Sequence, residues 1–205
     1  MLTTEEATFL LKLARRIATE GISDETREEE KVALPKLREK RGAFVCLREF
    51  DKSSKKVGRR IISSGYPLPV FPIVEGVKNA SLNISIHILR SSSQEIPEFL
   101  EDAVLELAIL TEPTKIIAEE PIRYPKEIEI GRDGLMVQRN FYTGVILPHV
   151  AIEKKWNAIE FLSECCMEAK LPADAWLEKE TSVYKFQTHV YVESEPNGDV
   201  VKVEF

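Results

Sequence analysis

The sequence predicts an α+β protein in which antiparallel sheets are flanked by helices. Three observations predict this class. Segments that alternate apolar and polar residues are joined by turn sequences, as in residues 182–193 and 200–205 around Pro196-Asn197-Gly198-Asp199. Segments with the 3.6-residue period of helices lie between such strands. Because strands pair with sequence neighbours instead of alternating strictly with helices, a doubly wound parallel sheet is not expected.

The first helix is expected over residues 3–20. Thr3 and Glu6 have the spacing of a capping box, in which each side chain accepts a hydrogen bond from the other residue's backbone N–H. Gly21 suits the left-handed position that ends many helices. The apolar face of this helix would consist of Leu10, Ala14, Ile17 and Ala18. The charge-rich stretch 23–40 is expected to mix loop and short helix.

The next elements surround a basic hairpin tip. Residues 42–47 are predicted to form a buried strand, residues 51–60 the exposed tip, and Ile61-Ile62 the beginning of the return strand. A proline-rich turn then leads into a helix that continues to about Arg90. Its apolar positions at helical spacing are Ile73, Val77, Ala80 and Ile84.

The second half of the chain is expected to begin with a polar loop over 91–98 and a strand over 103–111. A hairpin that turns at Asp133-Gly134 is predicted within residues 127–139, and a short strand within 145–150. A helix with a second capping box is predicted to follow. Its cap is Asn157 with Glu160, and its apolar face holds Ile159, Leu162, Cys166 and Ala169.

Composition and charge limit the class of protein. The 205 residues fit one domain or two small lobes that share a core, and 43% hydrophobic with 30% charged residues is typical of a globular chain. A net charge of −6 makes nucleic acid an unfavoured partner. Five Asn and three Gln against 34 acidic and 28 basic residues resemble thermophile composition.

The location predicted from the sequence is the cytoplasm. No apolar stretch approaches the ~20 residues that a membrane span needs, so no membrane association is expected. The N-terminus has no basic region before an apolar stretch and does not resemble a signal peptide. Three cysteines, an odd number without framework spacing, argue against a secreted disulfide scaffold.

Catalytic and metal-binding signatures are not found. The three histidines do not have metal-ligand spacing, so no metal site is predicted. Nucleotide-cradling glycine loops are missing, so the sequence leaves the cofactor unknown and enzymatic activity open. Cys165 and Cys166 are adjacent on a predicted helix, where they point about 100° apart. Cys166 is expected in the core and Cys165 toward solvent. Neither is expected to be a nucleophile, because both sit late in the helix.

The segment SSGYPLPVFPIVEG, residues 63–76, is the strongest candidate for a binding site. Its prolines fix the backbone between a strand and a helix, and Tyr66 and Phe71 are placed to wall a pocket. Glu75 lies one turn beyond Phe71, near the helix start, where a negative charge is favourable. A rigid corner of the core explains the same pattern equally well.

A basic cluster in residues 52–60 is the alternative interaction site. A solvated hairpin tip is the simpler interpretation, because no aromatic residues are interleaved for base stacking. The cluster consists of Lys52, Lys55, Lys56, Arg59 and Arg60.

The order of several blocks resembles the AMMECR-type domain family. These blocks include RGAFVCL, GYPLPVFPIVEG, LAILTEP, IEIGRDGLMV, TGVILPHV with Trp156, and CMEAKLPADAW. The resemblance covers about residues 5–193, and it implies a single domain over 1–205 made of two interleaved α+β lobes. It implies no established activity. The family's L-R-G-C-I-G motif before F-P-L-P is the usual guess for a functional cleft.

This chain departs from that motif. Gly65 matches, but Ser63 stands at the position of the family's Cys, and the motif's Arg and first Gly have no clear counterpart. Arg59 or Arg60 would supply the Arg only with a shift of the return strand. His149 replaces a usual Gln, and Lys170 replaces a usual Gly.

Two functions are predicted as alternatives. The first is a small-molecule binding or enzymatic protein with a cleft between the lobes, lined by Tyr66, Phe71, Glu75 and His149. The second is a module without chemistry that binds protein or RNA through the basic hairpin. Pairing of the final strand, VVKVEF, with another copy would in addition give a homodimer.

Overall fold

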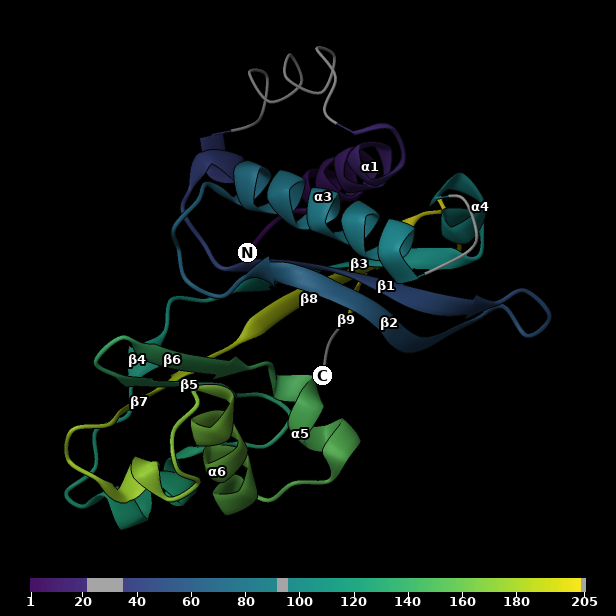
Figure 1. Cartoon of the computed structure of the whole chain (residues 1–205). Helices are drawn as coiled ribbons and strands as arrows, with labels where there is room; N and C mark the ends of the chain where they lie inside the picture. Colours follow the sequence, from purple (N-terminus) through teal and green to yellow (C-terminus); the bar gives the residue numbers. More distant parts are fainter. Residues whose placement is uncertain (22–34, 92–95, 204–205) are drawn as a thin grey trace. The chain divides into compact units, whose positions relative to one another are not determined.

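A computed structural model describes residues 1–21, 35–91 and 96–203 of the chain (Figure 1). The chain divides into two compact units. Unit 1 combines residues 1–109 with the C-terminal segment that begins at His189, and unit 2 comprises Leu110–Thr188. Unit 2 is therefore an insertion in the sequence of unit 1. Within the described ranges, no helix is long and apolar enough to cross a membrane.

Unit 1 contains a five-stranded sheet in the order β2-β1-β3-β8-β9. Its strands are β1 (Ala43–Asp51), β2 (Lys56–Tyr66), β3 (Ala103–Leu110), β8 (Thr188–Glu193) and β9 (Val200–Val203). The pairs β1–β2, β1–β3 and β8–β9 are antiparallel, and of these the hairpins β1–β2 and β8–β9 are the ones that the sequence predicts. β9 lies at an edge of the sheet. Its pairing with a second copy stays a prediction.

The helices of unit 1 lie on one face of this sheet (Figure 1). They are α1 (Thr4–Glu20), α3 (Ile73–Ser91) and the short α4 (Ile96–Glu101), with a 3-10 turn η1 (Pro35–Arg38) before β1. α1 packs against α3, and α3 packs against β1 and β2. The α4 helix begins inside the stretch that the sequence interprets as a polar loop. Part of that loop, and most of the predicted stretch 23–40, lie outside the described residues.

The predicted capping box of α1 is confirmed. Thr3 Oγ1 accepts the backbone N–H of Glu6 at 3.2 Å, and the Glu6 carboxylate accepts the backbone N–H of Thr3 at 2.7 Å. Gly21 follows with φ 82°, which a residue with a side chain rarely adopts. The predicted apolar face is buried in full, as are the four predicted positions of α3, namely Ile73, Val77, Ala80 and Ile84.

A buried ion pair joins α1 to the C-terminal strand. Arg15 on α1 forms an ion pair with Glu193, the last residue of β8, whose side chain is 3% exposed. Arg15 also donates to the carbonyls of Leu100 and Ala103, at 2.9 and 3.0 Å. The Glu193 carboxylate accepts the backbone N–H of Leu105 on β3 at 2.8 Å. One charged pair thus connects three segments that are far apart in sequence.

Unit 2 contains a four-stranded antiparallel sheet in the order β4-β7-β5-β6. Its strands are β4 (Thr114–Lys115), β5 (Gly134–Arg139), β6 (Tyr142–Ile146) and β7 (Ser182–Phe186). The helices are α5 (Pro148–Lys154) and α6 (Ala158–Glu168), with 3-10 turns η2 (Pro121–Glu127) and η3 (Ala175–Leu177). α6 packs on β5 and β6.

The close approach of α6 to β6 requires a glycine. A Cβ at Gly144 would lie 2.4 Å from the Ala169 nitrogen and from the Cys165 oxygen, far inside van der Waals contact. The second predicted capping box begins α6, because Asn157 and Glu160 exchange the expected hydrogen bonds. The buried face differs by one position. Ile159 is exposed and Phe161 is buried in its place.

Three sequence predictions in unit 2 are wrong. The hairpin does not turn at Asp133-Gly134: β5 begins at Gly134, and β5 and β6 turn beyond Arg139, where Asn140 has φ 53°. The predicted strand 145–150 ends at Ile146, and a proline then starts α5. The predicted strand 182–193 is broken at Gln187 into β7 and β8, which belong to different sheets.

All three cysteines are buried and unpaired. The expectation that Cys165 faces solvent is therefore wrong, because α6 turns that side toward β5 and β6. Burial raises the pKa of the Cys165 thiol far above its ordinary value and raises that of Cys166 to about 11. Burial, with the negative Glu106 nearby, raises the pKa of Cys46 to about 11. A group with such a pKa stays a neutral thiol at neutral pH.

We expect Glu193→Ala to lower the free energy of unfolding by about 3–5 kcal/mol, because Arg15 would remain buried without its partner. Urea denaturation followed by circular dichroism measures this change. Glu195→Gln, an exposed residue two positions away, is the control and should change stability by less than about 0.5 kcal/mol. A loss of less than about 1 kcal/mol for Glu193→Ala would contradict the role given to the pair.

We expect the native protein to react very slowly with a thiol reagent such as DTNB at pH 8. A thiol with a pKa of about 11 is only about 0.1% thiolate at that pH, and burial blocks access as well. In guanidinium chloride all three cysteines should react within minutes. Rapid modification of one equivalent in the native state, absent from the Cys46→Ser or the Cys166→Ser variant, would identify an accessible thiol and overturn the expectation.

Candidate functional site

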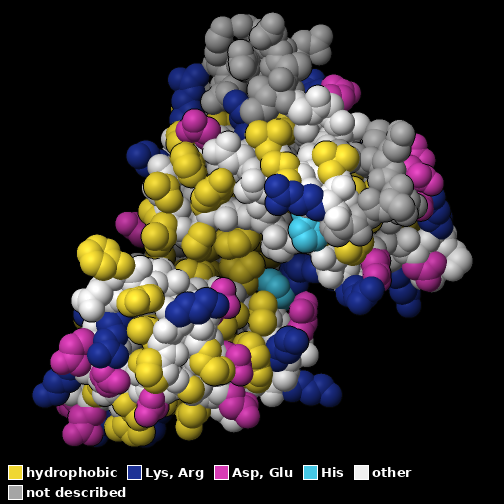
Figure 2. Space-filling view, viewed as in Figure 1, with side chains coloured by type: hydrophobic (Ala, Val, Ile, Leu, Met, Phe, Trp, Pro, Cys, Tyr) yellow, Lys and Arg dark blue, Asp and Glu magenta, His cyan; other side chains and the backbone are white. Residues whose placement is uncertain are grey.

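The predicted aromatic corner lies in unit 1, between β2 and α3. The rings of Tyr66 and Phe71 meet edge to face, with centroids 4.9 Å apart and an interplanar angle of 74°. Gly65 allows the close approach of β1, because a Cβ there would lie 2.3 Å from the Ala43 oxygen. Two apolar side chains of the corner are exposed, Leu68 at 38% and Val70 at 55%. Figure 2 shows hydrophobic side chains gathered where α3 begins.

The four residues of the predicted cleft are divided between the units. Glu75 is half-buried in the first turn of α3, as predicted, and it belongs to unit 1 with Tyr66 and Phe71. His149 lies in the first turn of α5 and belongs to unit 2. The structure therefore brings Tyr66 and Phe71 together within unit 1, and the four-residue set stays a prediction.

The turn of the basic hairpin is shorter than the predicted tip of residues 51–60, and it carries less uncompensated positive charge than the sequence suggests. β1 runs to Asp51 and β2 begins at Lys56, so Arg59 and Arg60 are strand residues. The Asp51 carboxylate closes the turn by accepting hydrogen bonds from the backbone and hydroxyl groups of Ser53 and Ser54, which lower its pKa.

Acidic partners neutralise three of the five predicted cations. Lys52 pairs with Asp102, which raises the pKa of the ammonium group, and Arg59 pairs with Glu49 at 2.7 Å. Arg60 pairs with Glu106 at 2.7 Å. Lys55 and Lys56 are exposed. An RNA-binding tip would need more uncompensated positive charge than this hairpin offers.

Sequence reasoning missed a row of polar side chains on the sheet of unit 1, which is buried at Cys46 and Glu106 and exposed at Ser63. Ser63, Cys46 and Glu106 are direct neighbours across β2, β1 and β3, and Cys46 Sγ lies 3.1 Å from Ser63 Oγ. The Glu106 carboxylate is fully buried and accepts from Arg60 on one oxygen and from Arg48 on the other, at 2.7 and 2.8 Å. A thiol therefore lies on the strand next to Ser63, the residue that the resemblance is expected to place at the motif's Cys position.

This row lacks the features of a catalytic thiol site. The raised pKa of Cys46 keeps its thiol protonated, and Glu106 adds to that rise instead of lowering it. Arg48 uses Nε and Nη2 on the Gly58 carbonyl and Nη1 on Glu106. Both carboxylate oxygens of Glu106 are occupied. The arrangement is an ionic network in which Arg48 and both oxygens of Glu106 already have partners, so it stabilises the sheet.

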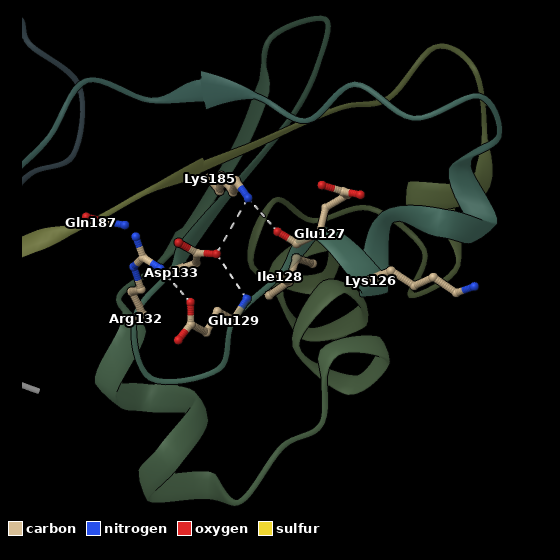
Figure 3. Close-up of a pocket in the computed structure, with 8 residues that line it drawn as sticks. All are labelled: Lys126, Glu127, Ile128, Glu129, Arg132, Asp133, Lys185 and Gln187. Atoms are coloured by element: carbon tan, nitrogen blue, oxygen red, sulfur yellow. Dashed lines mark hydrogen bonds and ion pairs between the residues drawn. The ribbon is translucent and has the colours of Figure 1, made fainter.

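A polar cavity of about 360 Å³ lies in unit 2 (Figure 3). Its wall is built from the end of η2, from the loop that leads into β5, and from the end of β7. Most of the lining side chains are charged or polar, and both signs of charge are present. The lining residues are Lys126, Glu127, Ile128, Glu129, Arg132, Asp133, Lys185 and Gln187.

Asp133 and Lys185 form the inner part of the cavity wall. Asp133 is buried, and its Oδ2 accepts the backbone N–H of Glu129 at 3.0 Å. The Lys185 ammonium lies 3.9 Å from the same oxygen and donates to the Glu127 carbonyl at 2.6 Å. Gly131, with φ 90°, turns the loop so that the Asp133 carboxylate faces back to Glu129. The sequence motif G-R-D-G is therefore a cap for this loop and not a hairpin turn.

Arg132 and Gln187 close the other side. Arg132 pairs with Glu129 at 2.7 Å, and in the amide orientation that satisfies both groups Gln187 accepts Arg132 Nε at 2.8 Å. A second hollow of about 190 Å³ shares Asp133, Lys185 and Gln187 with the first. In the described part of the chain, no three His, Cys, Asp or Glu side chains gather as metal ligands.

Several relatives of the chain are archaeal proteins. A protein of Pyrococcus furiosus is 38% identical over 193 residues, covering 94% of this chain and 90% of the relative. A protein of Methanopyrus kandleri is 35% identical over 199 residues, covering 97% and 94%. The thermophile-like origin of these relatives fits the small number of Asn and Gln residues in this chain.

A solved structure has the same fold. The crystal structure of an uncharacterized protein from Pyrococcus horikoshii superposes with a TM-score of 0.83 at 32% identity, covering 100% of this chain and 99% of that one. A comparison with protein families matches residues 11–191 to AMMECR1. The match covers both units, so the resemblance seen in the sequence is confirmed. This chain belongs to the AMMECR1 family.

Proposed function

We propose that this protein binds a small polar molecule in the cavity of unit 2. The main support for this proposal is the cavity itself. Its volume of about 360 Å³ lies within the usual range of ligand sites, roughly 300–1,000 Å³. Its polar groups converge from three separate segments, which is typical of a site that orients a ligand. Binding, rather than covalent chemistry, is the better reading because the three thiols are buried and protonated.

The aromatic corner is a second candidate for ligand binding. The edge-to-face contact of Tyr66 and Phe71 beside exposed Leu68 and Val70 favours an apolar group as its ligand. Within unit 1, Glu75 in the first turn of α3 would supply a polar contact. This region offers aromatic surface, whereas the cavity of unit 2 offers a partly open volume lined by charged groups, so the cavity carries the main proposal.

We also propose a cytoplasmic location. Three unpaired cysteines in a chain of this size are expected where thiols are kept reduced. The hairpin alternative, a protein or RNA module, has less support because Asp102, Glu49 and Glu106 hold three of its cations.

We expect at least one of a panel of charged metabolites to stabilise the protein and to move backbone amide signals of cavity residues. Suitable probes are glutamate, succinate, inorganic phosphate, adenosine monophosphate and putrescine. A ligand at a hundred times its Kd adds about 2.7 kcal/mol, so the Tm should rise by several degrees. Thermal-shift assays and two-dimensional NMR measure the two effects.

The control is a pair of matched variants. Glu127→Trp puts an indole ring at the exposed wall of the cavity and should weaken binding about tenfold or more, whereas Glu119→Trp makes the same exchange at an exposed residue outside it. The cavity is the wrong site if both variants bind equally well. It is not a site for these compounds at all if no member of the panel shifts a cavity amide.

A further inference from the structure

The cavity of unit 2 carries charges of both signs in equal number. Three cations and three carboxylates line it: Lys126, Arg132 and Lys185 against Glu127, Glu129 and Asp133. Four of these six are already in ion pairs: Arg132 with Glu129 at 2.7 Å and, more loosely, Lys185 with Asp133 at 3.9 Å. The positions that remain for a ligand are the unused donors and acceptors of Lys185 and Asp133, together with Lys126 and Glu127.

The cationic side of the cavity is Lys185. Its ammonium group has three protons, and one is directed to the Glu127 carbonyl at 2.6 Å. The Asp133 carboxylate lies 3.9 Å away, which is beyond hydrogen-bond distance but close enough for attraction. Two N–H groups are thus available for an anionic ligand group. The side chain is only partly exposed, so that charge is less screened than on an open surface.

The anionic side is Asp133 with Glu127. Asp133 Oδ2 accepts the Glu129 N–H, while Oδ1 accepts no hydrogen bond from the residues that the structure describes. In Figure 3, this second oxygen points away from Lys185. The Glu127 carboxylate is exposed on the same wall. Hydrogen-bond acceptors of a buried or half-buried carboxylate favour a cationic donor.

We propose that the ligand is a zwitterion, with a carboxylate for Lys185 and an ammonium group for Asp133 and Glu127. Free amino acids and short peptides are the chemical class with this pattern. A ligand with one negative charge would meet the buried Asp133, and a ligand with one positive charge would meet Lys185, so each would gain one attraction and suffer one repulsion. This inference rests on the proposed binding function and names its ligand class.

The test compares zwitterions with their single-charge halves at constant ionic strength. Glycylglycine and 6-aminohexanoate are the zwitterionic probes, and propionate and propylammonium are the controls of similar size. Chemical-shift titrations of the full chain give each Kd and show whether cavity amides respond. We expect at least one zwitterion to bind tenfold or more tightly than either single-charge probe.

Variants assign the charges. Lys185→Met keeps the apolar stem and should remove the preference for the zwitterion over propylammonium, while Glu127→Gln should weaken zwitterion binding severalfold with no effect on folding, since its side chain is exposed. Asp133→Asn keeps an acceptor for the Glu129 N–H and should weaken zwitterion binding tenfold or more. Arg123→Met, at an exposed pair with Glu119 outside the cavity, is the matched control and should leave every Kd unchanged.

The outcomes separate this inference from the function on which it rests. If propionate, propylammonium or another singly charged compound binds the cavity as tightly as the zwitterions do, the ligand class is wrong and small-molecule binding stands. If neither these probes nor the metabolite panel moves any cavity amide, both are wrong and the charges are a solvated, self-neutralised surface. Loss of affinity in Glu127→Gln with native circular dichroism excludes misfolding as the cause.

Discussion

The buried Arg15–Glu193 pair is the constraint on which the organisation of the chain depends. Unit 1 is made from two pieces of sequence, and its sheet is complete only when the C-terminal strands return beside β3. Glu193 secures that return, because its carboxylate accepts both from Arg15 on α1 and from the backbone of Leu105 on β3. Charge burial of this kind costs several kcal/mol in desolvation, which the carbonyls of Leu100 and Ala103 help to offset.

Unit 2 is inserted in the sequence between β3 and β8, which are neighbours in the sheet of unit 1. The chain segments that leave β3 and return to β8 must therefore lie close together. The backbone of Thr111, just after β3, donates to the Gln187 carbonyl at 2.8 Å, and the Gln187 N–H donates to the Thr111 hydroxyl at 2.8 Å. Gln187 is therefore a fixed point between β7 and β8. The register of β5 with β7 places Gly134 opposite Phe186, so Asp133 and Gln187 reach the same end of the sheet. The cavity is a consequence of how unit 2 is closed.

Elements held by local chemistry could be predicted from the sequence, and those held by distant contacts could not. The capping boxes at Thr3 and Asn157 depend only on residues three positions apart, and both are present. Gln187 breaks a strand without any turn residue, because the break is imposed by pairing with Thr111 in another part of the chain. The misplaced hairpin has the same origin, since Asp133 binds backward to Glu129. Lys170 has a φ of 61°, a left-handed backbone conformation that glycine adopts more readily than lysine.

The site follows the same division. Tyr66 and Phe71 are five positions apart, so the proline-rich corner was enough to predict that both rings lie in one region, and the structure adds that they contact each other. Lys185 and Asp133 meet only through strand pairing, and in the sequence each is an ordinary charge in an alternating segment. The charged cluster around Glu106 and the one formed by Asp133 and Lys185 differ in how many of their hydrogen-bonding positions are occupied. Glu106 has both oxygens filled by arginines and stabilises a sheet, whereas Asp133 and Lys185 keep unfilled donor and acceptor positions beside an open volume. This unfilled capacity beside a volume is the physical ground for the proposed binding site, and the Glu106 network lacks it.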